Sequence, residues 1–217
     1  MDASIELFIK NGYEKTTTRQ IIQKAGILNG SLYNLFESKD QIFSDVIMEA
    51  MWDSIRESEK YMPKNTPFAD MISFPICLLI YASSRSQRVA ELFATSNRIW
   101  EINKRVAESM AEWVKERDVN HTIPTDSPDF EVRLYACMGA LGTIIERFEK
   151  EPGSMTDVQA INVVAEILVS TFGLSTMNLE SRVGSVYEIV STHEVVICGM
   201  RVVPQDGDSI QLEPVES

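Results

Sequence analysis

Residues 16–40 have the sequence TTTRQIIQKAGILNGSLYNLFESKD, in which two short helical patterns meet at a sharp break. Thr17 and Gln20 have the spacing of a capping box, in which threonine accepts from the third helical N–H and glutamine bonds back to the cap. Gly26 is the natural end of this helix, because glycine adopts a left-handed backbone at little cost. A second helix is predicted over residues 29–36.

This second helix has an apolar side and a polar side. The apolar side is predicted to carry Leu32, Leu35 and Phe36. The other side carries Asn29, Gly30, Ser31, Tyr33 and Asn34. Such residues can donate to phosphates or contact base edges, and a glycine allows close approach. The pattern therefore predicts a helix-turn-helix whose second helix can enter the major groove, although spacing alone also permits a plain helical hairpin.

Residues 12–43, GYEKTTTRQIIQKAGILNGSLYNLFESKDQIF, closely resemble the DNA-binding domain of TetR-family transcriptional regulators. The matching residues are Gly12, Tyr13, Thr16, Thr17, Ile21, Ala25, Gly26, Gly30, Leu32, Tyr33, Phe36 and Lys39. The resemblance implies an all-α fold, with a three-helix DNA-binding domain at 1–47 and a helical ligand-binding and dimerisation domain at 48–175. It implies a cytoplasmic homodimer, most simply a repressor, that binds double-stranded operator DNA and responds to a small-molecule effector.

The resemblance also assigns DNA contacts by position. The family's phosphate contacts fall on Thr17, Thr18, Tyr33 and Lys39. Its base-reading positions fall on Arg19, Asn29, Gly30, Ser31 and Asn34. Leu28 stands where the family usually has a capping serine, so Asn29 is expected to take over the cap of the second helix.

The charge balance opposes nonspecific DNA binding. The formal net charge is −12, and residues 1–47 hold five Lys/Arg against six Asp/Glu. A protein that coats nucleic acid needs the opposite balance. Any positive face must therefore come from the placement of Lys10, Lys15, Arg19, Lys24 and Lys39.

A long helix links the N-terminal region to the rest of the chain. Ser38 and Gln41 form a second capping box at its start, and an apolar stripe runs along residues 39–62. Further helices are predicted over 68–83, with a kink or new start at Pro75, and over 86–94 and 96–118.

Two later helices suggest a dimer interface. Residues 130–150 carry a 4-3 heptad seam formed by Phe130, Leu134, Cys137, Leu141, Ile144 and Phe148. A second apolar or small set consists of Val132, Ala136, Gly139, Ala140 and Ile145. Residues 156–173 begin with a capping box, Thr156 and Gln159, and are apolar on several faces. We expect a homodimer through 130–150 and 156–173, with the seam between the subunits; two core helices of a monomer are the alternative.

Residues 176–217 depart from the family pattern. Residues 185–190 and 194–203 are rich in valine and isoleucine and predict two strands, joined by a turn at 191–193. A turn signal follows at Asp206-Gly207-Asp208, and the tail is acidic. This hairpin should pack on the helical body or on a partner, because an isolated hairpin is marginally stable.

The middle of the chain predicts a largely apolar ligand cavity, since large and flexible side chains are frequent there. The candidate ligand-binding residues are Trp52, Phe74, Tyr81, Phe93, Trp100, Met110, Trp113, Tyr135 and Met138. Each could equally be ordinary core. Four basic residues could meet an anionic ligand: Arg85, Arg98, Lys104 and Arg133.

Catalysis has little support in the sequence. The two histidines lack the spacing of metal ligands, there is no glycine-rich phosphate loop or nucleophile elbow, and no cofactor is expected. The three separated cysteines favour buried free thiols, and no apolar run is long enough to span a membrane. Beside the regulator, a dimeric helical binding module that no longer binds DNA remains open, and an enzyme that uses the cavity is a distant third.

Overall fold

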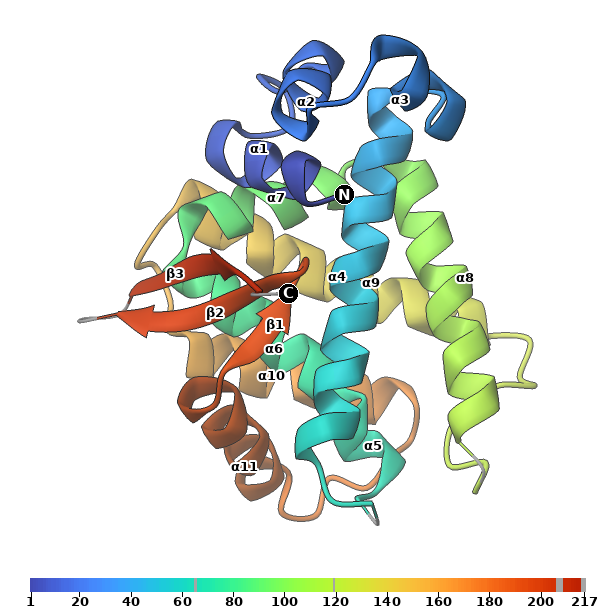
Figure 1. The fold of residues 1–217 in the computed structure, drawn as a ribbon. Helices are drawn as coiled ribbons and strands as arrows, with labels where there is room; N and C mark the ends of the chain where they lie inside the picture. Colours follow the sequence, from blue (N-terminus) through green and yellow to red (C-terminus); the bar gives the residue numbers. More distant parts are fainter. Residues whose placement is uncertain (65, 119, 206–208, 216–217) are drawn as a thin grey trace.

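The chain is predominantly helical (Figure 1). The structure, a computed structural model, describes residues 1–64, 66–118, 120–205 and 209–215. Three short helices come first, α1 (Asp2–Asn11), α2 (Thr18–Ala25) and α3 (Asn29–Leu35). Their apolar sides share one core that contains Ile5, Phe8, Ile21, Leu32 and Phe43. The predicted helical fold with an N-terminal helix-turn-helix is confirmed.

The local capping signals form as expected, with one difference. Thr17 and Gln20 complete a capping box, with the Thr17 N–H 2.8 Å from Gln20 Oε1. Gly26 ends α2 in the left-handed region, with φ 65°. Ser38 accepts from the Gln41 N–H, but the Gln41 side chain bonds the Glu37 N–H instead of returning to Ser38. The second capping box is therefore only half formed.

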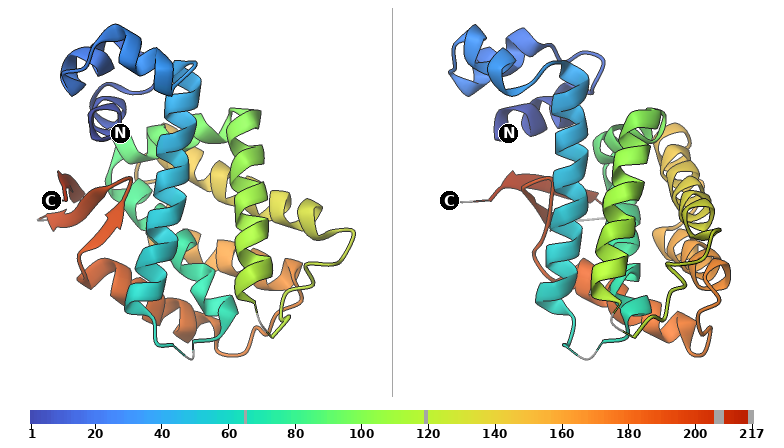
Figure 2. Two further views of the ribbon diagram at one scale, coloured as in Figure 1. Left: turned by 45° about the vertical axis from the view of Figure 1, so that its right-hand side comes forward. Right: turned by 90° about the vertical axis from the view of Figure 1, so that its right-hand side faces the viewer.

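Helix α4 (Lys39–Tyr61) runs from the three N-terminal helices down the whole body. Figure 2 shows α8 (Trp100–Arg117) running alongside it. Arg105 on α8 joins the two helices, because its guanidinium bonds the Ser44 hydroxyl at 2.9 Å and pairs with Asp45. A single rigid element thus connects the N-terminal helices to the body.

The remaining body helices are α5 (Phe68–Met71), α6 (Ser73–Arg85), α7 (Gln87–Asn97), α9 (Phe130–Lys150), α10 (Asp157–Thr171) and α11 (Leu179–Thr192). The predicted helix over 68–83 is divided at Ile72. Pro75 is the third residue of α6, where its missing N–H leaves no helical hydrogen bond unmade. No helix in the described ranges has the length and apolarity needed to cross a membrane.

The heptad seam of α9 was predicted to lie between subunits, and this is wrong. Phe130, Leu134 and Cys137 are buried in one core cluster of the chain, and Phe148 is buried in another, against which the partly buried Leu141 and Ile144 pack. A charge introduced on this seam would therefore disrupt the fold of one subunit.

The C-terminal region contains a sheet that includes the second predicted strand, residues 194–203, which divides into two strands joined by a turn, but not the first. Residues 185–190 belong to α11, whose Val183, Val186 and Val190 are buried at helical spacing. The sheet has the order β1-β2-β3, with β1 (Val195–Ile197), β2 (Met200–Gln205) and β3 (Ser209–Pro214) all antiparallel. The predicted turn at 206–208 lies outside the described residues.

The first hairpin of this sheet is fixed to α4. Its two turn residues, Cys198 and Gly199, have φ of 53° and 66°, the signs of a tight primed turn. The Gly199 N–H donates to Asp53 Oδ2 at 2.6 Å, and Tyr61 donates to the Glu194 carbonyl at 2.7 Å. The sheet therefore packs against α4 (Figure 1).

Replacing Asp53 should loosen this attachment. Asp53→Ala removes a charged acceptor, so we expect the free energy of unfolding to fall by about 1.5–3 kcal/mol. Urea unfolding measures the loss, and hydrogen exchange should show faster exchange of the β1–β2 amides. Arg56 donates to both Asp53 and Glu49. Glu49→Ala is therefore the matched control: it removes the more exposed of these two carboxylates, and the substitution should cost about 0.5 kcal/mol. Equal losses from both variants would contradict the attachment.

Candidate nucleic-acid interface and ligand cavity

The polar side of the helix-turn-helix is exposed. Tyr33 has 58% of its surface accessible, and Ser31, Asn34 and Arg19 are also exposed. A Cβ built on Gly30 would meet no atom within 4 Å. The structure therefore leaves this surface open along α3, as major-groove contact requires.

The start of α3 differs from expectation. The helix begins at Asn29 with Leu28 in the N-cap position, and no side chain caps it. The idea that Asn29 takes over the cap is wrong, and the Asn29 side chain lies outside the described residues. Leu35, predicted on the apolar side, is 68% exposed, whereas Leu32 is buried and Phe36 half-buried. Leu35 and Leu28, which is 79% exposed, give this surface an apolar component.

The remaining predicted contacts are partly engaged within the chain. The Thr17 hydroxyl takes part in the capping box, and Thr18 is half-buried. Lys39 donates to the Tyr13 carbonyl at 3.0 Å and lies 4.1 Å from the centre of the Tyr13 ring. Burial, together with the bond that Tyr13 donates to Asp40, raises the pKa of Tyr13. Lys39 thus braces the α1–α2 connection and remains at the surface.

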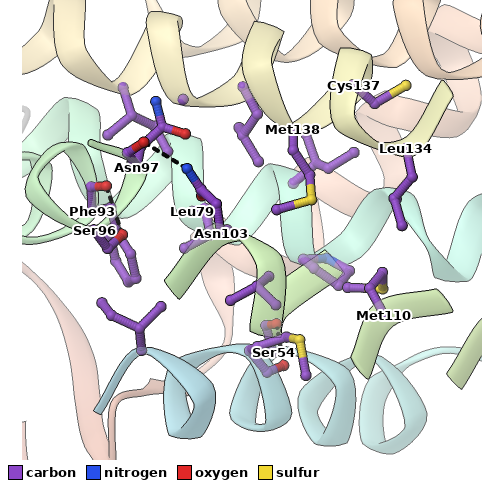
Figure 3. A pocket seen from close by; sticks show the side chains of 18 of the residues that line it. Ser54, Leu79, Phe93, Ser96, Asn97, Asn103, Met110, Leu134, Cys137 and Met138 are labelled. Atoms are coloured by element: carbon purple, nitrogen blue, oxygen red, sulfur yellow. Dashed lines mark hydrogen bonds between the residues drawn. The ribbon is translucent and has the colours of Figure 1, made fainter. Parts of the chain in front are cut away.

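A cavity of about 150 Å³ lies in the body between α4 and α9 (Figure 3). Its walls come from six helices, α4, α6, α7, α8, α9 and α10. The lining is almost wholly apolar, and its polar side chains are Ser54, Ser96, Asn97 and Asn103. A cavity of this volume holds a molecule about the size of one aromatic ring.

Three of the nine predicted ligand residues, Phe93, Met110 and Met138, line this cavity. The other six do not. Phe74, Tyr81 and Trp113 are buried core, and Trp52 packs against the core. Trp100 is 61% exposed and stacks on Tyr135, with ring centroids 5.5 Å apart.

Apart from Met138, sequence reasoning missed the residues of α9 that line the cavity. Leu134, Cys137, Leu141 and Gly142 line the cavity, yet the heptad spacing had assigned the first three to a subunit seam. Gly142 leaves room for the Asn97 side chain, because a Cβ at this position would lie 2.3 Å from it. A glycine on a helix with an otherwise apolar face was the available signal.

The four basic residues considered for an anionic ligand do not line the cavity. Arg85 pairs with Asp157, Arg98 with Glu146 and Glu149, and Lys104 lies 3.9 Å from Glu108. Arg133 bonds the Thr171 carbonyl. No Asp, Glu, Lys or Arg belongs to the lining in the described part of the chain.

The outer surface of α9 and α10 is the remaining surface of interest. Val132, Ala136, Gly139 and Thr143 are exposed at helical spacing along α9, and Val163 is exposed on α10. These small residues form a smooth strip, which we call the α9 strip (Val132, Ala136, Gly139, Thr143). Ala140 is half-buried, and Ile145 from the second predicted set is buried.

Comparison with known proteins finds similarity to transcriptional regulators in the N-terminal region. The family model for bacterial regulatory proteins of the tetR family matches residues 1–46. The HTH-type transcriptional regulator QacR of Staphylococcus aureus is 39% identical over 57 residues, which are 25% of this chain and 30% of QacR. The fatty acid metabolism regulator protein of Bacillus subtilis is 30% identical over 60 residues, 28% of this chain and 31% of that protein.

The similarity beyond this region is weaker. The matches with these two relatives span about a third of the relatives' own length. A solved TetR-like transcriptional regulator from Rhodococcus sp. RHA1 is 16% identical, covers 77% of this chain and 90% of its own, and has a TM-score of 0.44.

Proposed function

We propose that this chain, which belongs to the TetR family through the DNA-binding domain at its N-terminus, is a transcriptional repressor released from its operator by a small, largely apolar effector. The observation that carries the proposal is the course of α4. Its Ile42 and Phe43 lie in the core shared with the helix-turn-helix, and its Ile47, Met51 and Ser54 line the cavity. A change in the cavity wall therefore acts on the helix that packs against the helix-turn-helix.

The DNA contacts in this proposal are the positions assigned by the family resemblance, most of which lie on the exposed surface. Tyr33, Thr17, Thr18 and Lys39 contact phosphates, while Arg19, Asn29, Gly30, Ser31 and Asn34 approach base edges. The open space over Gly30 supports close approach of the DNA. Because the chain is acidic overall, specific contacts must supply most of the affinity.

The proposed active form is a homodimer that pairs through the outer surfaces of α9 and α10. The exposed α9 strip supports this, since small side chains let two helices approach closely. Two recognition helices must be about one helical turn of DNA apart. An effector can release DNA only by binding more tightly to the dimer whose helices are mis-spaced, and operator DNA must then weaken effector binding by the same factor.

Tyr33 offers the direct test of the DNA-binding surface. Tyr33→Ala should weaken binding to DNA from upstream of the protein's own gene and to unrelated DNA alike, by about tenfold, because a phosphate contact carries no sequence preference. Fluorescence anisotropy at moderate salt measures both affinities. Asn34→Ala should instead reduce the preference for the operator, at about 1–3 kcal/mol per lost base contact.

Gly30→Ala complements these substitutions, because the new methyl group meets nothing inside the chain and should leave the stability of the protein intact. A loss of DNA binding in this variant would then come from contact between the methyl group and the DNA. Wild-type affinity in the Tyr33→Ala and Gly30→Ala variants would remove α3 from the interface.

A second candidate function is a dimeric helical small-molecule binding module that does not bind DNA. The exposed Leu28 and Leu35 beside the polar residues favour it, because apolar side chains contribute little to phosphate contact. Sequence-selective binding to any DNA fragment separates the two functions.

A further inference from the structure

The cavity has two chemically different ends. Figure 3 shows Ser96, Asn97 and Asn103 gathered at one end and Leu134, Cys137 and Met138 at the other. Burial raises the pKa of the Cys137 thiol, so this sulfur is neutral and behaves as an apolar group. The polar end is formed where α7 ends and α8 begins.

The serine hydroxyls are committed to their own helices. Ser96 donates to the Phe93 carbonyl at 2.8 Å, and Ser54 donates to the Met51 carbonyl at 2.7 Å. These donors have no remaining proton to offer a ligand. The hydrogen-bonding capacity of the cavity therefore rests mainly on the two asparagines.

The carboxamides of Asn97 and Asn103 retain unused groups. Asn103 Nδ2 donates to the Asn97 backbone carbonyl at 2.6 Å. Within the described ranges, the Asn97 side chain and Asn103 Oδ1 have no other hydrogen-bond partner. Both residues line the cavity, so these groups are available to a molecule inside it.

Gly142 determines where the Asn97 carboxamide lies. The side-chain Cγ, Oδ1 and Nδ2 of Asn97 are each 2.3 Å from the place that a Cβ on Gly142 would take. The amide thus packs directly on the backbone of α9. Any larger residue at 142 would displace it from the cavity wall.

The absence of charge from the described lining restricts the ligand further. An ionised carboxylate or ammonium inside this cavity would lose its hydration without gaining a counter-charge, so an ion should bind more weakly than a neutral molecule of similar shape. Arg98 and Arg85, which were considered for an anionic ligand, are already paired with carboxylates. A single hydroxyl can both donate to and accept from a carboxamide, whichever way the amide is turned.

We propose that the cavity binds an uncharged, ring-sized molecule with one hydroxyl group, which hydrogen-bonds to Asn97 and Asn103 while the ring contacts Met110, Met138 and Leu134. The inference rests on the proposed function only in taking this cavity as the effector site. A simple phenol is the smallest molecule of this class.

Calorimetric titration with phenol, toluene, benzoate and benzylammonium tests the proposal at pH 7. Phenol and toluene have nearly the same shape, so their affinity ratio isolates the hydroxyl. Phenol should bind at least as tightly as toluene, and the two ions should bind at least tenfold more weakly than phenol.

Asn97→Leu preserves the side-chain shape and removes the amide. In this variant the ratio of phenol to toluene affinity should fall by about tenfold, because the hydroxyl loses one of its two hydrogen-bond partners. Met110→Leu, at the apolar part of the lining, should change both affinities alike and leave the ratio unchanged. Gly142→Ala should lower the ratio as Asn97→Leu does, by displacing the amide.

The proposal is overturned if no probe binds, if toluene binds more than tenfold tighter than phenol to the unchanged protein, if an ion binds best, or if Asn97→Leu leaves the ratio as it was. The titrations contain no DNA. Repeating the phenol titration with operator DNA tests the proposed function separately, since equal affinities would reject the switch and leave the ligand class in place.

Discussion

Gly139→Glu is expected to convert the protein to a monomer at micromolar concentration and to lower its affinity for operator DNA by about 100-fold or more. A carboxylate in the middle of the α9 strip would be buried against a second subunit without a partner. Once the subunits separate, the two half-sites no longer gain from being bound together. Sedimentation velocity and anisotropy measure the two effects.

The structure makes this variant informative, because a Cβ on Gly139 would meet nothing within 4 Å in its own chain. The subunit should therefore keep its fold, which circular dichroism can check. Gly139→Ala is the small control and should remain dimeric. Ser185→Glu, on the exposed side of α11, is the charge control. A folded, dimeric Gly139→Glu variant would show that the interface lies elsewhere.

Arg85→Met should lower the free energy of unfolding by about 3 kcal/mol, with a fall in Tm of about 6–12 °C. Arg85 on α6 pairs with Asp157 at the start of α10 and bonds the Tyr187 hydroxyl of α11 at 3.1 Å. Tyr187 in turn donates to Asp157 at 2.8 Å. Removing the guanidinium leaves a largely buried carboxylate without its counter-charge.

The loss should stay near the lower end of the range for buried pairs. Asp157 also accepts from the Val158 N–H at 2.9 Å, and the start of a helix favours a negative charge. Arg98→Met is the matched control, because Arg98 is more exposed although it pairs with two carboxylates; it should cost about 1 kcal/mol or less. Differential scanning calorimetry compares the two.

The double variant Arg85→Met, Asp157→Asn should recover part of the lost stability, since it removes the unpaired charge as well. If the single and double variants lose the same amount, the penalty comes from packing of the arginine side chain over the Tyr81 ring and not from the charge.

The features that the sequence predicted best depend on neighbouring residues. The capping boxes of Thr17 and Thr156 need only a residue three positions away, and the left-handed Gly26 needs only its own lack of a side chain. The matched family region is likewise contiguous. Such signals predict the local structure correctly because tertiary packing does not compete with them.

The errors arose where packing partners decide the outcome. Residues 185–190 are rich in β-branched side chains, but the buried side of Val183, Val186 and Val190 packs with α6 and α10, and this burial outweighs strand propensity. The α9 seam was assigned to a partner subunit because the spacing of apolar residues shows that a helix face is buried. The spacing does not show whether that face packs on its own chain or on a second one.

The ligand residues illustrate a further limit. We selected large aromatic residues and two methionines for the cavity. Met110 and Met138 line it, yet Phe74 and Trp113 fill space instead of leaving it. A cavity forms where small or flexible side chains fail to fill the gap between helices, here beside Gly142, Ser96 and the methionines. That property belongs to six helices together, and Gly142 is its one local signal in the described part of the sequence.

The attachment of the sheet to α4 also bears on how the chain folds during synthesis. The Gly199 turn lies next to Ile5, since a Cβ there would be 3.8 Å from Ile5 Cδ1, and Ile197 and Val202 share a core with Ile5 and Phe8. At about 5–20 residues per second, the ribosome makes these strands roughly 10–40 s after α1. During that interval the apolar groups of α1 and α4 that the sheet later covers remain exposed, so a chaperone that binds nascent apolar segments would find its target at the start of this chain until the strands emerge.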